Sequence, residues 1–224
     1  MTKPFRFRPE ILGKKLGMTQ FFNQDGDAVP VTVIELTENI ITDVKTPVKD
    51  GYAAIQIGAN IKKDKHLNKP KLGNLKKKGL PNLSYLKEFR VKPEELDSYK
   101  VGQVIDYSKT LTLKEKVDVS GISIGKGFQG MVKLHNKHRG PKTHGSKSYR
   151  GPGSIGAHTY PGRVLPGKHM PSRMGNEEVT VRNLEVVDFD KEKNLLLVRG
   201  AIPGVEGTML VIKPSIKKWN VAAA

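Results

Sequence analysis

A glycine-rich stretch in the middle of the chain could bind a nucleotide. The sequence GKGFQG places Gly125, Gly127 and Gly130 in the GxGxxG spacing of dinucleotide-binding loops, after the strand-like VDVSGISI. In such sites an acidic residue about 20 positions further on binds the ribose. Here the next acid after Asp118 is Glu177. We therefore interpret these glycines as points where the backbone turns and can approach a phosphate closely, with a nucleotide-dependent enzyme as the competing hypothesis.

Five of the six histidines fall in the same part of the chain, where they could be metal ligands: His135, His138, His144, His158 and His169. No Cys, Asp or Glu accompanies them, and the neighbouring lysines oppose cation binding, so we expect no metal site. We interpret these imidazoles as donors to phosphates or stacking faces for bases. Paired carboxylates are also absent from residues 119–176. The sequence therefore predicts no enzyme, no cofactor and no small-molecule substrate.

The charge distribution indicates a nucleic-acid partner. The chain has 39 Lys and Arg against 22 Asp and Glu, a net charge of +17. From Val119 to Asn176 there is no acid, while ten Lys or Arg occur. Lysines neutralise phosphates, arginines bridge them, and tyrosines stack on bases. The candidate RNA-binding residues are Lys126, Lys133, His135, Lys137, His138, Arg139, Lys142, His144, Lys147, Tyr149, Arg150, His158, Tyr160, Arg163, Lys168, His169 and Arg173.

A second basic cluster lies in residues 61–80, with Asp64 as its single acid. Pro70 and Gly73 interrupt it, so we expect no continuous amphipathic helix there. A solvated surface loop and a second phosphate-binding patch both remain open. The candidate patch residues are Lys62, Lys63, Lys69, Lys71, Lys76, Lys77 and Lys78.

The elements that must position these residues are mostly strands. Alternating and β-branched runs such as AVPVTVIEL, GYAAIQIGA and GTMLVIKPS, separated by tight turn signals, predict an antiparallel barrel. Helix signals are few: the three-residue spacing in NLSYLKEFRV predicts a helix over 82–91, and GMVKLHN a short one around Met131. We expect a mainly β barrel domain from residues 1–125 and 176–218, with a basic insertion at 61–80 and a tail at 219–224.

Residues 126–175 are predicted to form a long extended loop. Arg150–Gly175 alone holds six glycines and four prolines, and neither the helical nor the strand period persists. Ile155, Tyr160 and Leu165 are interspersed with the charges, unlike the polar monotony of pure disorder. We infer an arm that becomes ordered against RNA.

Membrane binding is not indicated. No run of about 18 apolar residues exists. The absence of cysteine fits a reducing compartment. The opening MTKPFRFRPE lacks the apolar segment of a signal peptide, while a trimmed transit peptide stays open.

Several ordered motifs resemble one known family. ILGKKLGMTQFF, VPVTVIE, DGYAAIQIG, VDVSGISIGKGFQG, THGSKSYRGPGSIGA and PGRVLPGKHMPSRMGNEEVTVRNLEVV together make the chain similar to the universal large-subunit ribosomal protein three family in its bacterial form. The resemblance extends from Ile11 to about Lys218. Features such as LNKPKLGNL look most like cyanobacterial or plastid members.

The resemblance implies a six-stranded Greek-key barrel of the translation-protein type. It also implies direct binding to large-subunit (23S-type) rRNA near its 3′ end, early entry into assembly, and a loop tip, around 154–170, pointing toward the peptidyl transferase centre. Neighbouring ribosomal proteins would be partners, Mg²⁺ could accompany the rRNA, and the location would be a ribosome in a bacterial cytoplasm or plastid stroma. Many members carry a methylated glutamine where this chain has Arg173. A free-standing RNA chaperone or regulator is the alternative function.

Overall fold

The fold of this chain is described by a computed structural model over residues 10–24, 26–107 and 115–215. The predicted tail at 219–224 lies outside the described residues. The described chain is mainly β with a few short helices, which confirms the expected class. It divides into two compact units, one of residues 1–122 with 178–224 and one of residues 123–177. The predicted loop, 126–175, lies within the second unit, which we call the arm.

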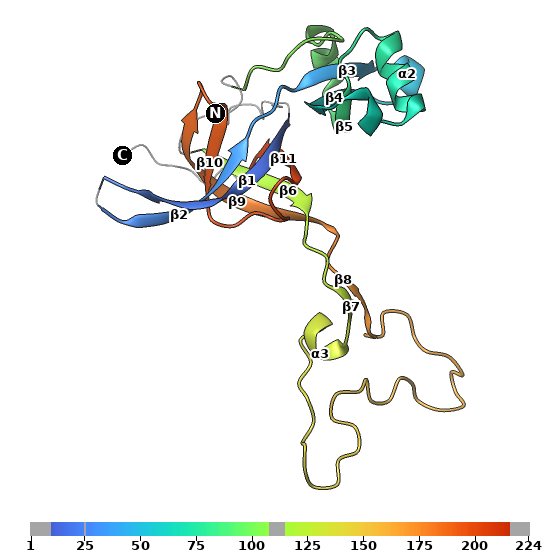
Figure 1. The fold of residues 1–224 in the computed structure, drawn as a ribbon. Helices are drawn as coiled ribbons and strands as arrows, with labels where there is room; N and C mark the ends of the chain where they lie inside the picture. The colour runs from blue at the N-terminus through green and yellow to red at the C-terminus, as the bar shows by residue number, and fades with distance from the viewer. Residues whose placement is uncertain (1–9, 25, 108–114, 216–224) are drawn as a thin grey trace, which may run out of the picture. The chain divides into compact units, whose positions relative to one another are not determined.

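Six strands of the first unit close into an antiparallel barrel (Figure 1). In order around the barrel they are β1 (Ile11–Phe22), β11 (Met209–Pro214), β6 (Lys116–Ile122), β9 (Glu178–Asp190), β10 (Leu195–Arg199) and β2 (Ala28–Glu35). Alternate residues point inward, so Ile34, Val119, Val198 and Leu210 share one core cluster. Gly121 makes room for that packing, because a Cβ there would lie 2.7 Å from Leu210 Cδ2.

A three-stranded antiparallel sheet packs against the outside of the barrel strands. It has the order β3 (Ile40–Lys45), β4 (Ala54–Ile61) and β5 (Leu83–Arg90). Ile55 and Phe89 of this sheet are buried in one cluster with Leu12 and Val211 of the barrel. The shared apolar cluster joins the sheet and the barrel into one folding unit.

The helices are all short. They are α1 (Pro47–Asp50), α2 (Lys69–Lys77) and α3 (Met131–Leu134), with 3-10 turns η1 (Asp64–His66) and η2 (Pro93–Ser98). None of the helices among the described residues has the length and hydrophobicity needed to cross a membrane. The short helix expected around Met131 is confirmed as α3.

One local prediction is wrong, and another holds only in part, since residues 61–80 are not one helix but α2 continues across Gly73. Residues Leu83–Arg90 form strand β5, not a helix, because their backbone pairs with β4 and Leu83 and Phe89 are buried in two different clusters. Residues Lys69–Lys77 do form one helix across Pro70 and Gly73. Pro70 occupies the first turn, where a missing N–H leaves no intrahelical bond unmade. Leu75 is buried beside Leu83 and holds this helix to the sheet.

The arm has little regular structure. Its two ends pair as β7 (Gly127–Gln129) and β8 (Ser172–Met174), and α3 follows β7 (Figure 1). No helix or strand occurs between residues 135 and 171, all of which are described. Met131 is the single buried apolar side chain of residues 123–177. The arm therefore has no hydrophobic core of its own.

Candidate nucleic-acid interface

The candidate RNA-binding side chains of the arm are almost all on its surface. Sixteen of the seventeen predicted residues are exposed, and His135 is half-buried. Tyr160 is 90% exposed and Phe128 72% exposed, so both present aromatic faces to the surroundings. Exposed aromatic rings on a protein segment are suited to stacking with unpaired bases. The structure places these residues along one extended segment and brings few of them together.

The cations of the arm have no intramolecular counter-charge. All of residues 123–177 are described, and none of the ten Lys and Arg of this segment forms an ion pair. The one acid of the arm is Glu177, at its base. A concentration of unpaired positive charge on an extended backbone favours a polyanion, because each contact releases condensed counterions.

The base of the arm is held by backbone bonds and one glycine. The Lys126 N–H donates to Met174 O at 2.8 Å, and the Asn176 N–H donates to Ser123 O at 3.2 Å. Gly175 has a φ of +73°, and a Cβ there would lie 2.1 Å from Ile124 O. Only glycine fits this position without moving the paired chain.

The GxGxxG stretch does not form a dinucleotide loop. After β6 the chain enters the short strand β7 (Gly127–Gln129), and the following α3 has only four residues. Gly127 needs its glycine for a φ of +67°, whereas Gly130 has a φ of −74° that any residue adopts. Gly127 therefore allows the chain to change direction at β7, in agreement with our interpretation of these glycines as turning points of the backbone.

Two of the arm's histidines stack on each other. The rings of His135 and His169 are parallel within 2° with their centroids 4.2 Å apart, and His135 Nε2 lies 3.0 Å from Met170 O. This stack joins the outgoing and returning limbs of the arm near α3. Among the described residues no group of three or more His, Cys, Asp or Glu could hold a metal ion.

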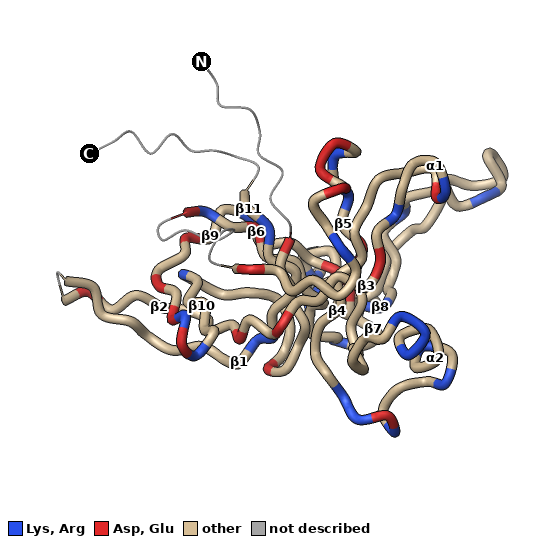
Figure 2. Tube along the Cα trace, turned by 90° about the horizontal axis from the view of Figure 1, so that it is seen from above, with Lys and Arg blue, Asp and Glu red and all other residues tan. Residues whose placement is uncertain are grey.

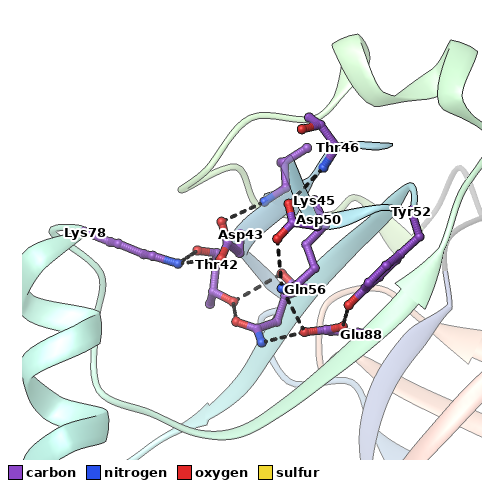
Figure 3. Close-up of polar contacts among 10 residues, drawn as sticks. Thr42, Asp43, Lys45, Thr46, Asp50, Tyr52, Gln56, Lys78 and Glu88 are labelled. Atoms are coloured by element: carbon purple, nitrogen blue, oxygen red, sulfur yellow. Dashed lines mark hydrogen bonds and ion pairs between the residues drawn. The ribbon is translucent and has the colours of Figure 1, made fainter. Parts of the chain in front are cut away.

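The lysines around α2 divide into two groups. Lys78 Nζ pairs with Asp43 Oδ2 at 2.9 Å and donates to Thr42 O (Figure 3). Lys71 Nζ donates to Ser84 O. Lys76 Nζ bonds Asp64 Oδ2 at 3.1 Å, which lowers the pKa of that carboxyl. Burial lowers the pKa of Lys71. These three predicted patch residues are therefore engaged in polar contacts within the chain.

The other four predicted patch residues remain available to a ligand. Lys62, Lys63, Lys69 and Lys77 are exposed and form no ion pair among the described residues. Figure 2 shows Lys and Arg gathered on α2 and on the turn before it. Of the seven lysines of the predicted patch, four are therefore free of the polar contacts that engage the other three.

Sequence reasoning missed a polar network on the β3–β4–β5 sheet (Figure 3). The Tyr52 hydroxyl donates to Glu88 Oε2 at 2.9 Å, and Lys45 Nζ lies 3.8 Å from Glu88 Oε1 and 3.5 Å from Asp50 Oδ1. The Glu88 carboxylate raises the pKa of Lys45, and the hydrogen bond to Glu88 raises the pKa of Tyr52. Arg90 lies over the Tyr52 ring at 4.3 Å.

The charges of this network balance, because the two cations Lys45 and Arg90 and the two carboxylates Asp50 and Glu88 lie around Tyr52. The network leaves no unbalanced charge for a nucleic acid. The signal for it in the sequence is weak, because the pairing of Ala54 with Arg90 and Gln56 with Glu88 is known only from the strand register.

Comparison with known proteins bears on both units. Residues 91–195 match the profile of a family described as Ribosomal protein L3. Three curated relatives each carry the name "Large ribosomal subunit protein uL3". The one from Prochlorococcus marinus subsp. pastoris is 51% identical over 214 residues, 96% of this chain and 97% of the relative.

The other two relatives come from different bacteria. The protein of Alkaliphilus metalliredigens is 48% identical over 93% of this chain and 98% of its own length. That of Carboxydothermus hydrogenoformans is 49% identical over 92% of this chain and 97% of its own length. Identity of this order over nearly the whole length covers the barrel and the arm alike. The chain therefore belongs to the Ribosomal protein L3 family, whose members are structural, non-enzymatic proteins of the large ribosomal subunit.

Proposed function

We propose that this chain is a structural constituent of the large ribosomal subunit that binds 23S-type rRNA directly through the arm. The observation that carries the proposal is the arm itself, which has ten exposed Lys and Arg without ion-pair partners and one buried apolar side chain. A segment of this kind gains its order from a partner, and the partner must be anionic.

The family relationship extends the proposal. We propose that the chain binds near the 3′ end of the rRNA, enters assembly early, and directs the arm tip, residues 154–170, toward the peptidyl transferase centre. The barrel would be a Greek-key barrel of the translation-protein type. Lys62, Lys63, Lys69 and Lys77 would make additional phosphate contacts, and Mg²⁺ bound by the rRNA would require no protein ligand. The ribosome would be that of a bacterium or a plastid.

Sedimentation after a high-salt wash tests the proposal. Lysate is run through a sucrose gradient in high salt, and the chain is followed by immunoblot. Salt restores counterions to phosphate and strips loosely bound basic proteins, whereas an arm threaded through folded RNA should resist. We expect the chain to stay in the large-subunit peak. Release to the top of the gradient would contradict the proposal and favour a free-standing RNA chaperone or regulator.

A matched pair of variants tests the role of the arm. Arg163→Ala with Lys168→Ala should leave the thermal transition unchanged and reduce the salt slope of rRNA binding by about one per lost phosphate contact. Lys193→Ala, an exposed cation in the β9–β10 turn, removes charge outside the arm and should leave the rRNA footprint intact. Equal footprints in the double variant and the parent would argue against arm contacts.

A further inference from the structure

The hairpin of β1 and β2 extends beyond the barrel. β1 pairs with β11 only over Ile11–Lys14, and β2 pairs with β10 only over Val31–Glu35. Gly17–Thr19 pair with Val31–Val33 of β2, whereas Gln20–Phe22 pair with Ala28–Pro30 and run out from the barrel as a two-stranded ribbon (Figure 1). We call them the β1–β2 ribbon. A two-stranded ribbon buries little surface, so the barrel ends of β1 and β2 must hold it in place.

One edge of the ribbon has open backbone groups. The Asn23 N–H donates to Asp27 O at 3.0 Å, which makes this a hydrogen-bonded pair. Such pairs alternate along an antiparallel ladder, so Met18, Gln20 and Phe22 direct their N–H and C=O away from β2. The Gly200 N–H, which donates to Pro30 O on the opposite side of β2, agrees with this alternation. Among the described residues, no backbone group bonds this outer side of Met18–Phe22, which we call the open edge.

The open edge lacks two common protections against strand addition, a charged side chain and a proline on the edge strand. Leu16–Phe22 contains no charge and no proline. Met18 is 53% exposed and Phe22 61% exposed. Native proteins protect long exposed edges with lysines, prolines or a covering element, and an apolar edge without these is a site where another chain pairs. Pro30 on the other strand lacks an N–H, so the ribbon presents one usable edge.

The charge around the open edge selects the partner. Residues 16–44 contain no Lys or Arg and five Asp or Glu, within a chain of net charge +17. Glu206 lies beside the edge, since its Oε1 is 3.4 Å from where a Cβ on Gly17 would be. Lys15 Nζ is held by Ile202 O and Gly204 O. In Figure 2 the protruding part of the hairpin carries acidic but no basic positions. Phosphates would be repelled here, whereas a cationic peptide would be attracted.

We propose that the open edge binds an extended, Lys- or Arg-bearing segment of a neighbouring large-subunit protein, which adds a strand beside β1. Backbone bonds to Met18, Gln20 and Phe22 supply affinity, and the Met18 and Phe22 side chains supply an apolar contact. Glu206 and Asp27 attract the cations of that segment. The inference rests on the chain's place in the large subunit, and it uses none of the arm residues proposed to bind rRNA.

Photocrosslinking in intact large subunits tests the inference. Phe22 is replaced by benzoylphenylalanine in the full chain, and large subunits are isolated and irradiated. We expect a crosslink to a peptide of another large-subunit protein that carries Lys or Arg. The same probe at Val48, which is 100% exposed on α1, is the control for random capture. A crosslink to rRNA, a crosslink to a second copy of the chain, or no crosslink from residue 22 would each overturn the inference.

A proline at the open edge separates strand addition from side-chain contact. Gln20→Pro removes the outward N–H without touching the bonds between β1 and β2, and Gln20→Ala keeps that N–H. We expect the crosslink yield at residue 22 to fall at least about tenfold in Gln20→Pro and to stay within about twofold in Gln20→Ala. Equal yields in both variants would refute strand addition.

A charge variant covers the case in which the proline variant fails to fold. Met18→Lys places a cation on the edge and should reduce the yield by repelling a cationic segment, whereas Met18→Gln should not. A yield that rises in Met18→Lys would show an anionic partner and overturn the inference. Absence of the chain from the large-subunit fraction would refute both this inference and the ribosomal role, whereas a chain that is present and does not crosslink refutes the inference alone.

Discussion

At the scale of single residues, one buried amide links β1 to the rest of the first unit. Asn39 is fully buried, its Oδ1 accepts from the Leu12 N–H at 2.7 Å, and its Nδ2 donates to Leu12 O at 2.9 Å. The side chain thus takes the place of a strand partner for Leu12. Buried polar groups of this kind are costly to leave unpaired.

We expect Asn39→Ala to lower the free energy of unfolding by about 2–4 kcal/mol, because two backbone groups of Leu12 lose their partner in the interior. Urea denaturation measures this. Asn74→Ala, which truncates an exposed amide on α2, is the control and should change stability by less than about 0.5 kcal/mol. Similar values for the two variants would show that Asn39 has no special role.

The Asp64 carboxyl gives a second test at this scale. The hydrogen bond from Lys76 lowers the pKa of Asp64 in the folded chain, so this carboxylate contributes stability above its unfolded pKa of about 3.9. That contribution is lost as the pH falls through the folded pKa. We expect Lys76→Gln to move the Asp64 titration to higher pH in a carboxyl NMR experiment. Lys77→Gln is the control, and an equal shift there would contradict the pairing.

At the scale of elements, the β7–β8 pair closes the base of the arm. The pair has only three residues in each strand, and Gly175 lies directly after it with a φ of +73°. The close approach of Gly175 to Ile124 O leaves no space for a side chain. The short ladder therefore depends on this glycine.

We expect Gly175→Ala to open this ladder, because the new Cβ would overlap a backbone oxygen. Hydrogen exchange at the Lys126 amide should accelerate at least about tenfold while exchange in the barrel strands stays unchanged. Gly130→Ala is the matched control, since Gly130 has an ordinary φ and no atom within 4 Å of the added Cβ. Slow exchange at Lys126 in the Gly175 variant would show that the chain accommodates the side chain.

At the scale of the whole molecule, the two units differ in what stabilises them. The first unit contains every buried apolar side chain of the described residues except Met131. The arm starts after Ile122 and ends before Glu178, and these two residues face each other in the β6–β9 ladder. A two-residue turn can therefore join Ile122 to Glu178 without bending the barrel strands.

We expect deletion of residues 123–177, with Asn-Gly joining Ile122 to Glu178, to leave a cooperative thermal transition. Its midpoint should stay within about 4 °C of the parent, which corresponds to about 1 kcal/mol in a chain of this size. The same deletion should abolish high-salt retention on large subunits, because it removes ten of the 39 Lys and Arg. Calorimetry checks the first part, and loss of the cooperative transition would mean that the arm helps to fold the barrel.

Much of this organisation could be predicted from the sequence. The alternation of Val29, Val31 and Val33 predicts a strand without tertiary information, and all three lie in β2, whereas the β2 residue in the core cluster is Ile34. The arm could also be predicted from the sequence. A long segment that lacks acids and a hydrophobic period and is rich in Gly and Pro cannot bury a core. Because the arm has no core, its candidate RNA-binding side chains remain exposed.

Other features were decided by tertiary contacts. Leu83, Leu86 and Phe89 have helical spacing, yet they form β5 because β4 offers a free edge and two apolar clusters receive their side chains. Pro70 is compatible with a helix only because it falls in the first turn. The division of the lysines of 61–80 into structural and exposed groups depends on acids and carbonyls that the fold brings near, such as Asp43 for Lys78.

The sequence by itself therefore determined which segments carry a core and which carry unpaired charge, since both are properties of local composition and period. Only the tertiary structure decided which backbone groups of β1 remain open, which lysines are engaged, and that Asn39 serves as a strand partner. The physical reason is that hydrogen bonds and ion pairs join residues distant along the chain, and register and packing alone determine which of them meet.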